Sequence, residues 1–330
     1  MSVREWGVHV QRPVSAAEVA LLEQAGVQVV TVPLFWRWIE RVEGRIDFTS
    51  VRHLLAPLTG GSFRIQGLLG PAMPHALPEW LMARGGVDAP DFLGGFARYC
   101  AHVAHELPEL GLVRVEDELN SAHPWETMRT RRRRGKRWRD RSFSAELLLT
   151  SCAALRDARE DISLRVTLQA GSLGWKRDLS SWLAQGLRVD RIGLSLAPCA
   201  RRPDPRLAQR VAAALTDASA LLATYGDAGD ATELEISRVS YPTHGAAWTP
   251  RRQREFLVEA VNSANRAGAV GFHWSSLRDQ AYDDPSLGYW TPSSQRHEGL
   301  LYYDGSSKPI MDELRVLATG DRFGEGGGAV

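Results

Sequence analysis

The stretch LRVTLQAGSLGWKRDLSSWLAQGLRVDRIGLSL, residues 164–196, contains two short strand-like runs with a helical segment between them. Leu164–Ala170 and Arg191–Leu196 are rich in leucine and β-branched residues, which favours strands, and Leu179–Ala184 has a helical pattern. Two strands connected through a helix form a parallel βα unit, because a parallel connection must cross back over the sheet. This stretch therefore predicts an α/β protein with a parallel sheet.

The same alternation extends to both ends of the chain. Strands are predicted at Gly7–Val10, Val27–Pro33, Phe63–Leu69, Leu112–Asp117, Leu164–Ala170, Arg191–Leu196, Leu234–Val239 and Ala269–Trp274. Helices are predicted at Ser15–Ala25, Phe92–His105, Ser144–Glu160, Leu179–Ala184, Arg206–Thr224, Pro250–Ala267 and Lys308–Leu317. Eight strands alternating with helices is the number for a (β/α)8 TIM barrel.

A doubly wound open sheet is the alternative fold. Such a sheet usually has a glycine-rich phosphate turn after its first strand, whereas VQRPVSAAE follows here at 10–18. We therefore predict a single (β/α)8 barrel over 1–319. The remaining residues, 320–330, are glycine-rich and are predicted to form a disordered tail.

Composition excludes several classes of protein. The 330 residues are 44% hydrophobic and 24% charged, which is typical of a globular protein with a sizeable core. No apolar run is long enough for a membrane span, and Met1–Gln11 does not resemble a secretory signal. Three scattered cysteines, dispersed histidines and the lack of a phosphate-binding glycine loop favour no metal and no cofactor. A cytoplasmic location is the expectation.

Several short motifs lie where the predicted strands end, which is where a (β/α)8 barrel has its active site. They are LFWRWIERVEGRIDF at 34–48, LPEWL at 77–81, DELN at 117–120, Trp274, and YDGSSKP at 303–309. In this order they resemble the motifs of clan-A retaining glycoside hydrolases, particularly the β-galactosidase-like and cellulase-like members. The resemblance covers nearly the whole chain.

The resemblance implies a pair of catalytic carboxyl groups. Retaining hydrolysis needs a proton donor for the leaving oxygen and a carboxylate nucleophile about 5–5.5 Å away. Glu118 matches the acid/base position, although it could instead belong to a salt-bridge network with Arg114. In the β-galactosidase-like register Glu235 is the nucleophile, whereas the cellulase-like register places Arg238 at that position.

Strand alternation supports Glu235 as a barrel-facing carboxylate. Leu234 and Ile236 are apolar and are expected to face the helices, which turns Glu235 inward. Glu235 could nevertheless lie too deep in the barrel and pair with Arg114. The sequence therefore leaves the identity of the nucleophile, or its loss, open.

The resemblance also implies residues that bind sugar. Predicted substrate-binding residues are Trp36, Asp117, Asn120, Trp125, Arg238 and Trp274, with the tryptophans as platforms for sugar rings. Asp117 replaces the asparagine of the family, Thr31 replaces an arginine that many members carry, and Ser195 and Ala197 replace a histidine and a tyrosine. Such changes indicate an altered specificity or a loss of catalysis.

Two functions from different classes follow. The first is a retaining glycosidase acting on an oligosaccharide or glycoside, and the alternative is a degenerate barrel that binds a glycan or a partner without hydrolysis. Whether the chain is an enzyme, and which sugar it takes, are not decided by the sequence.

One short segment is strongly basic. Residues 129–141, RTRRRRGKRWRDR, carry a net charge of +8 in a chain whose formal net charge is +1, so the rest is mildly acidic. The segment is either a solvated loop or a binding site for an anionic polymer such as an acidic polysaccharide. Nucleic acid is the less favoured partner because no nucleic-acid-binding motif surrounds the segment.

Overall fold

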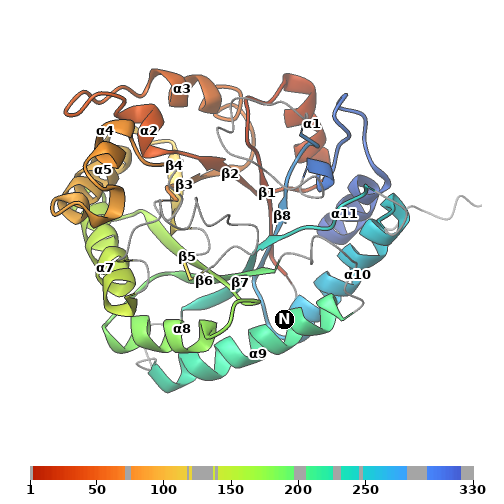
Figure 1. The fold of residues 1–330 in the computed structure, drawn as a ribbon. Coiled ribbons are helices and arrows are strands. Elements are labelled where there is room, and N and C mark those ends of the chain that lie inside the picture. The colour runs from red at the N-terminus through yellow and green to blue at the C-terminus, as the bar shows by residue number, and fades with distance from the viewer. Residues whose placement is uncertain are drawn as a thin grey trace, which may run out of the picture.

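The computed structural model describes residues 3–70, 76–116, 119–120, 137, 140–196, 206–225, 232–244, 248–280 and 296–320. Eight parallel strands follow one another around a closed barrel, and β1 pairs with β8 to complete it (Figure 1). They are β1 (Glu5–His9), β2 (Val29–Pro33), β3 (Arg64–Leu68), β4 (Leu110–Glu116), β5 (Ser163–Gln169), β6 (Arg191–Leu196), β7 (Glu233–Val239) and β8 (Gly271–Ser275). The predicted (β/α)8 TIM barrel is confirmed.

Helices form a ring around the barrel (Figure 1). They are α1 (Ala16–Gln24), α2 (Trp36–Ile39), α3 (Thr49–Leu55), α4 (Glu79–Ala83), α5 (Phe92–Glu106), α7 (Arg141–Ala158), α8 (Trp175–Ala184), α9 (Leu207–Tyr225), α10 (Pro250–Arg266) and α11 (Pro309–Thr319), with the 3-10 helix η2 at Gly86–Asp88. The short helices α2, α3 and α4 were not predicted. No described helix is both long and apolar enough to cross a bilayer.

The ends of the helices follow from local sequence. Ser15 caps α1 by accepting the backbone N–H of Glu18, whose carboxylate in turn accepts the backbone N–H of Ser15. Thr249 caps α10 by accepting the backbone N–H of Arg252, and Pro250 fits the first turn because proline has no N–H to satisfy. These caps fix where each helix begins after its strand.

The main hydrophobic core lies between the strands and the helices. Alternate strand residues such as Val30, Leu164 and Ile236 point outward and are fully buried against helix faces. Ile310 and Leu314 of α11 belong to the same core, so the last helix is packed onto the barrel. Of the tail predicted at 320–330, only Gly320 lies within the described residues.

The inside of the barrel is polar rather than apolar. Inward strand positions carry buried polar or charged side chains, namely Glu5, His9, Thr31, Gln66, Arg114, Glu116, Arg165, Thr167, Ser195, Glu235, Ser237 and His273. Branched aliphatic residues usually fill such a barrel. The filling here must therefore be held by hydrogen bonds and ion pairs, because buried polar groups without partners destabilise a fold.

Glycines on neighbouring strands make room for this filling. A Cβ at Gly7 would lie 2.1 Å from Nδ1 of His273, and a Cβ at Gly193 would lie 2.4 Å from Cβ of Ser237. Neither distance is compatible with a side chain, so these positions require glycine while His273 and Ser237 keep their places inside the barrel. Each of these glycines thus lies opposite an inward polar side chain of the neighbouring strand, His273 or Ser237.

Candidate functional site

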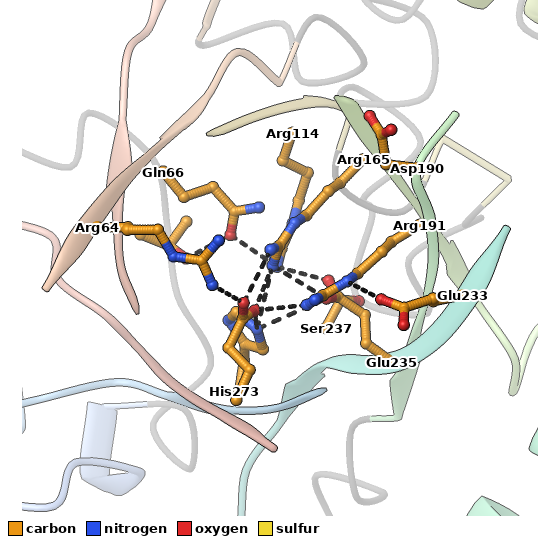
Figure 2. Close-up of polar contacts among 12 residues, drawn as sticks. Arg64, Gln66, Arg114, Arg165, Asp190, Arg191, Glu233, Glu235, Ser237 and His273 are labelled. Carbon is orange, nitrogen blue, oxygen red and sulfur yellow. Dashed lines mark hydrogen bonds and ion pairs between the residues drawn. The ribbon is translucent and has the colours of Figure 1, made fainter. Parts of the chain in front are cut away.

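A group of charged side chains occupies the N-terminal end of the barrel, and we call it the axial ion cluster. It consists of Glu5, Arg165, Arg191, Glu235 and His273, which come from five strands. Figure 2 labels Arg165, Arg191, Glu235 and His273. Arg165 Nη1 lies 2.7 Å from Glu5 Oε1 and 3.0 Å from Glu235 Oε2. Arg191 Nη1 lies 2.7 Å from Glu5 Oε1 and 3.3 Å from Glu235 Oε2. The two carboxylates thus share two guanidinium groups.

Glu235 is held firmly within this cluster. Its side chain faces the barrel, as strand alternation predicts, but is fully buried. Burial raises the pKa of Glu235, but the neighbouring Arg165, His273 and Arg114 outweigh that effect, so the pKa lies below its usual value. The predicted pairing with Arg114 is present as well, at 3.7 Å between Nη2 and Oε1. Glu235 is therefore an ionised partner of arginines.

The donor types in the axial ion cluster raise the question of a metal. Oxygen or nitrogen atoms of Glu5, Glu235 and His273 lie within 4.8 Å of one another. Both carboxylates, however, are already bonded to Arg165 and Arg191, and a cation there would have to displace guanidinium groups. These residues do not fit a metal centre.

A second polar layer, further along the strands, connects β1 to β4. His9 Nε2 lies 3.0 Å from the carbonyl oxygen of Ser237 and 3.1 Å from Nη1 of Arg114. Arg114 also donates to Gln66 Oε1, which accepts from Thr31 Oγ1. Burial lowers the pKa of His9, and Arg114, Arg238 and His273 lower it further, so His9 is neutral in the folded protein.

Acid is expected to destabilise the fold through two buried histidines, His9 and His273. Burial is the largest cause that lowers the pKa of both His9 and His273 below 6.5. The unfolded chain therefore binds more protons once the pH falls below 6.5, and stability falls with it. The free energy of unfolding should drop by at most about 1.4 kcal/mol per pH unit for each histidine between pH 6.5 and 4.5.

Urea unfolding at several pH values measures this slope. His9→Gln should reduce the slope, while His53→Gln on the exposed face of α3 should leave it unchanged. An equal slope in wild type and His9→Gln would contradict the assignment.

The C-terminal end of the barrel is where the expected site residues should gather. β7 ends there with Arg238 and Val239, and Arg238 is half-buried and close enough to His9 to act on its charge. β4 ends there with Glu116, which is fully buried. Glu118, Asp117 and Trp125 lie outside the described residues, so the structure does not give the distance between Glu118 and Glu235.

The two described tryptophans of the predicted site are covered by protein. Trp36 is 1% exposed, donates from Nε1 to Glu40 at 2.6 Å, and stacks on Tyr99 at a centroid distance of 5.5 Å. Trp274 is fully buried, points away from the barrel axis towards Phe256 of α10, and donates from Nε1 to the carbonyl of Glu298. Neither offers a free ring face to a sugar in this conformation.

Asn120 joins the segment after β4 to the end of β5. Its Nδ2 donates to the Gln169 carbonyl and to Ser172 Oγ, and its Oδ1 accepts the Gln169 backbone N–H. These bonds use most of the amide's capacity, so Asn120 positions the strand-end loops. Of the basic segment 129–141, the structure describes only residues 137, 140 and 141, where Arg141 pairs with Asp178.

Sequence reasoning missed a buried ion pair behind β8. Lys308 Nζ lies 2.6 Å from Asp279 Oδ1 and also donates to Thr243 Oγ1 and the His297 carbonyl. Both side chains are buried, which is rare for lysine unless it is paired. The KP pair at 308–309, just before a helix, marks the position in the sequence, but nothing there indicates the partner.

Comparisons with known proteins give the fold a context. No protein-family model and no curated protein matches the chain. A GH5_18 protein from Streptomyces cattleya in complex with GlcNAc aligns with a TM-score of 0.73 and 15% sequence identity. The alignment covers 97% of this chain and 82% of the Streptomyces protein. The chain has the fold of clan-A glycoside hydrolases.

Two further solved structures extend this fold likeness. The GH1 β-glucosidase from Exiguobacterium antarcticum aligns at TM-score 0.69 and 11% identity over 96% of this chain and 97% of its own. The exo-β-1,4-mannosidase Op5Man5 from an Opitutaceae bacterium aligns with a TM-score of 0.71 and 14% sequence identity. The alignment covers 96% of this chain but only 59% of the mannosidase chain. At these identities the likeness concerns the fold.

Proposed function

We propose that this barrel binds a glycan or glycoside at its C-terminal end without the two-carboxylate hydrolysis of retaining glycosidases. The observation that carries the proposal is the position of Glu235. The carboxylate that β7 would supply is fully buried in the axial ion cluster, bonded to Arg165 and Arg191, and four residues before the strand ends. At the end of the described strand stand Arg238 and Val239 instead.

The chemistry of retaining hydrolysis explains why this position matters. The nucleophile must present a free carboxylate oxygen to the anomeric carbon, about 5–5.5 Å from the acid/base. Glu235 Oε2 already accepts from two guanidinium groups. Oε1 has no hydrogen-bond partner among the described residues, but it is buried and lies 3.7 Å from Arg114 Nη2. Attack on a sugar would require breaking buried charge pairs, which strongly opposes such a step.

Support for a saccharide ligand comes from the fold and from the polar residues at the strand ends. The Streptomyces cattleya protein with this fold holds GlcNAc. Here His9, Gln11 and Arg238 lie at the C-terminal ends of β1 and β7, where barrels of this kind bind their ligands. Asn120, in the segment after β4, is bonded to Gln169 at the end of β5, at the same end of the barrel. Asp117 and Trp125, which the sequence also predicts to bind sugar, lie outside the described residues.

Hydrolysis with Glu118 as acid/base and Glu235 as nucleophile is the second candidate. It is favoured by the sequence position of Glu118, two residues after Glu116, the last residue of β4. Binding of an anionic polymer by residues 129–141 is a separate proposal, tested by comparing polymer binding before and after deletion of that segment.

Binding and turnover assays on one panel separate the two candidates. We expect calorimetry to detect at least one neutral manno-, gluco- or chito-oligosaccharide, with no turnover of the matching 4-nitrophenyl glycosides. Arg238→Gln should weaken this binding, and Arg251→Gln, at an 83% exposed side chain on α10, should not. Turnover that disappears in Glu118→Gln while binding persists would overturn the non-hydrolytic proposal.

A further inference from the structure

A pocket opens beside the C-terminal ends of β1 and β8. It is lined on one side by Val10, Gln11, Arg12, Val14 and Glu18, and on the other by residues 276–280. The volume, including its open mouth, is about 410 Å³. Because both walls follow directly on strands of the barrel, the pocket borders the surface proposed to bind a saccharide.

Most charges in this pocket are already paired. Glu18 Oε1 lies 2.6 Å from Arg278 Nη2, and Asp279 Oδ1 lies 2.6 Å from Lys308 Nζ. Arg12 differs from these residues, because it forms no ion pair with any described residue. Among the described residues, Arg12 is therefore the cation of this pocket that no carboxylate pairs with.

The guanidinium of Arg12 is also partly cut off from water. Its Nη2 atom is buried and has no hydrogen-bond partner among the described residues. The aromatic ring of Tyr303, with its centroid 5.9 Å from Arg12 Cζ, covers another part of the group. A buried donor of a charged group without an acceptor is unfavourable, so an acceptor brought by a ligand would be bound strongly.

A neighbouring amide supplies a second donor. Gln11 Oε1 accepts from Gln280 Nε2, which fixes the Gln11 amide so that its Nε2 is the end left to donate. A guanidinium and an amide N–H in one pocket suit a planar oxyanion, because the arginine can make two parallel bonds to it. One uncompensated positive charge matches the single negative charge of a carboxylate.

We propose that this Arg12 pocket binds the carboxylate of an acidic sugar, so that the saccharide carries a uronate unit. The inference rests on the proposed function, because the rest of the saccharide would lie on the C-terminal end of the barrel. A hydroxyl of a neutral sugar could accept one bond but would leave the charge of Arg12 uncompensated. A uronate satisfies both the bond and the charge.

The experiment compares sugars that differ only at C6. Methyl glucuronide, galacturonide and mannuronide are each titrated against the matching neutral methyl glycoside, with the full-length protein observed by NMR. At least one acidic member should bind about tenfold or more tightly than its neutral partner. The preference should weaken at high salt because it depends on charge.

Variants at Arg12 show whether this residue carries the preference. Arg12→Gln should bring the two members of the pair to equal affinity, and Arg12→Lys, which keeps the charge but not the paired donors, should give an intermediate preference. Arg251→Gln removes an exposed arginine of α10 and should change nothing. Thermal unfolding of each variant checks that a loss of the binding preference is not caused by unfolding of the protein.

The outcomes separate this inference from the function on which it rests. A preference for acidic sugars that persists in Arg12→Gln, or equal binding of acidic and neutral sugars, overturns carboxylate binding by the Arg12 pocket but leaves the proposed function standing. If acetate binds as tightly as the uronides, the pocket recognises a carboxylate but not a sugar, and the acidic sugar is overturned as the ligand of the Arg12 pocket. Failure of every saccharide, including the neutral oligosaccharides, overturns the proposed function as well.

Discussion

Glu235→Gln is expected to lower the free energy of unfolding by about 3–5 kcal/mol, as removal of one partner from a buried ion pair does. The substitution leaves Arg165 with Glu5 as its remaining described acidic partner, and it leaves Arg114 facing a neutral amide 3.7 Å away. Both guanidinium groups are essentially buried, so water cannot replace the lost charge. Urea unfolding with a two-state fit measures the change.

A matched control separates burial from charge. Glu255→Gln removes the acid of an exposed pair with Arg251 on α10 and should change stability by about 0.5 kcal/mol or less. If Glu235→Gln were equally mild, the axial ion cluster would not hold the barrel together. If it also abolished a measurable glycosidase turnover without destabilising the fold, the nucleophile role of Glu235 would be restored.

Lys308→Met is expected to have an effect of similar size, about 3–5 kcal/mol. Lys308 joins three segments, since it donates to Thr243 after β7, to Asp279 after β8, and to the His297 carbonyl. Among the described residues, the buried Asp279 carboxylate then keeps the backbone N–H of Gly299 and the imidazole of His297, whose Nδ1 lies 3.7 Å from Oδ2. The region before α11 should therefore unfold first, which hydrogen exchange can detect alongside urea unfolding.

Lys176→Met is the control for Lys308→Met. Lys176 pairs with Asp217 at 2.5 Å, but the two side chains are 52% and 42% exposed. An exposed pair contributes about 0–1 kcal/mol, so this variant should stay close to wild type. A double variant, Lys308→Met with Asp279→Leu, should be less destabilised than the sum of its single changes, because it removes both buried charges together.

The barrel was predictable because its signal is repeated. Each strand is a short apolar or alternating run, and caps such as Ser15 mark the helix that follows. The helix α3 was missed because Thr49–Leu55 spans only seven residues, too few for a helical period to stand out. Strand bounds shifted by one or two residues, as with β1, which begins at Glu5 rather than Gly7.

The candidate site was only partly predictable. The alternation of strand residues correctly predicted that Glu235 faces the inside of the barrel. How deep Glu235 lies along the barrel axis depends on how neighbouring strands are staggered. Register shifts between Leu194 and Ser195 and between Ile236 and Val239 alter that stagger, and no pattern in the sequence indicates them. The pairing of Lys308 with Asp279, or of Glu5 with Arg165, joins residues far apart in the chain and likewise required the structure.

The polar filling of the barrel limits how this sequence can change over evolutionary time. Glu5 on the first strand and Glu235 on the seventh pair with the same two arginines. Loss of either acid alone would leave a buried guanidinium with one carboxylate partner fewer, and selection would act against the resulting loss of stability. Gly7 and Gly193 are tied to His273 and Ser237 in the same way through space. Descendants of this barrel should inherit these positions as linked sets, while the loops above them diverge freely.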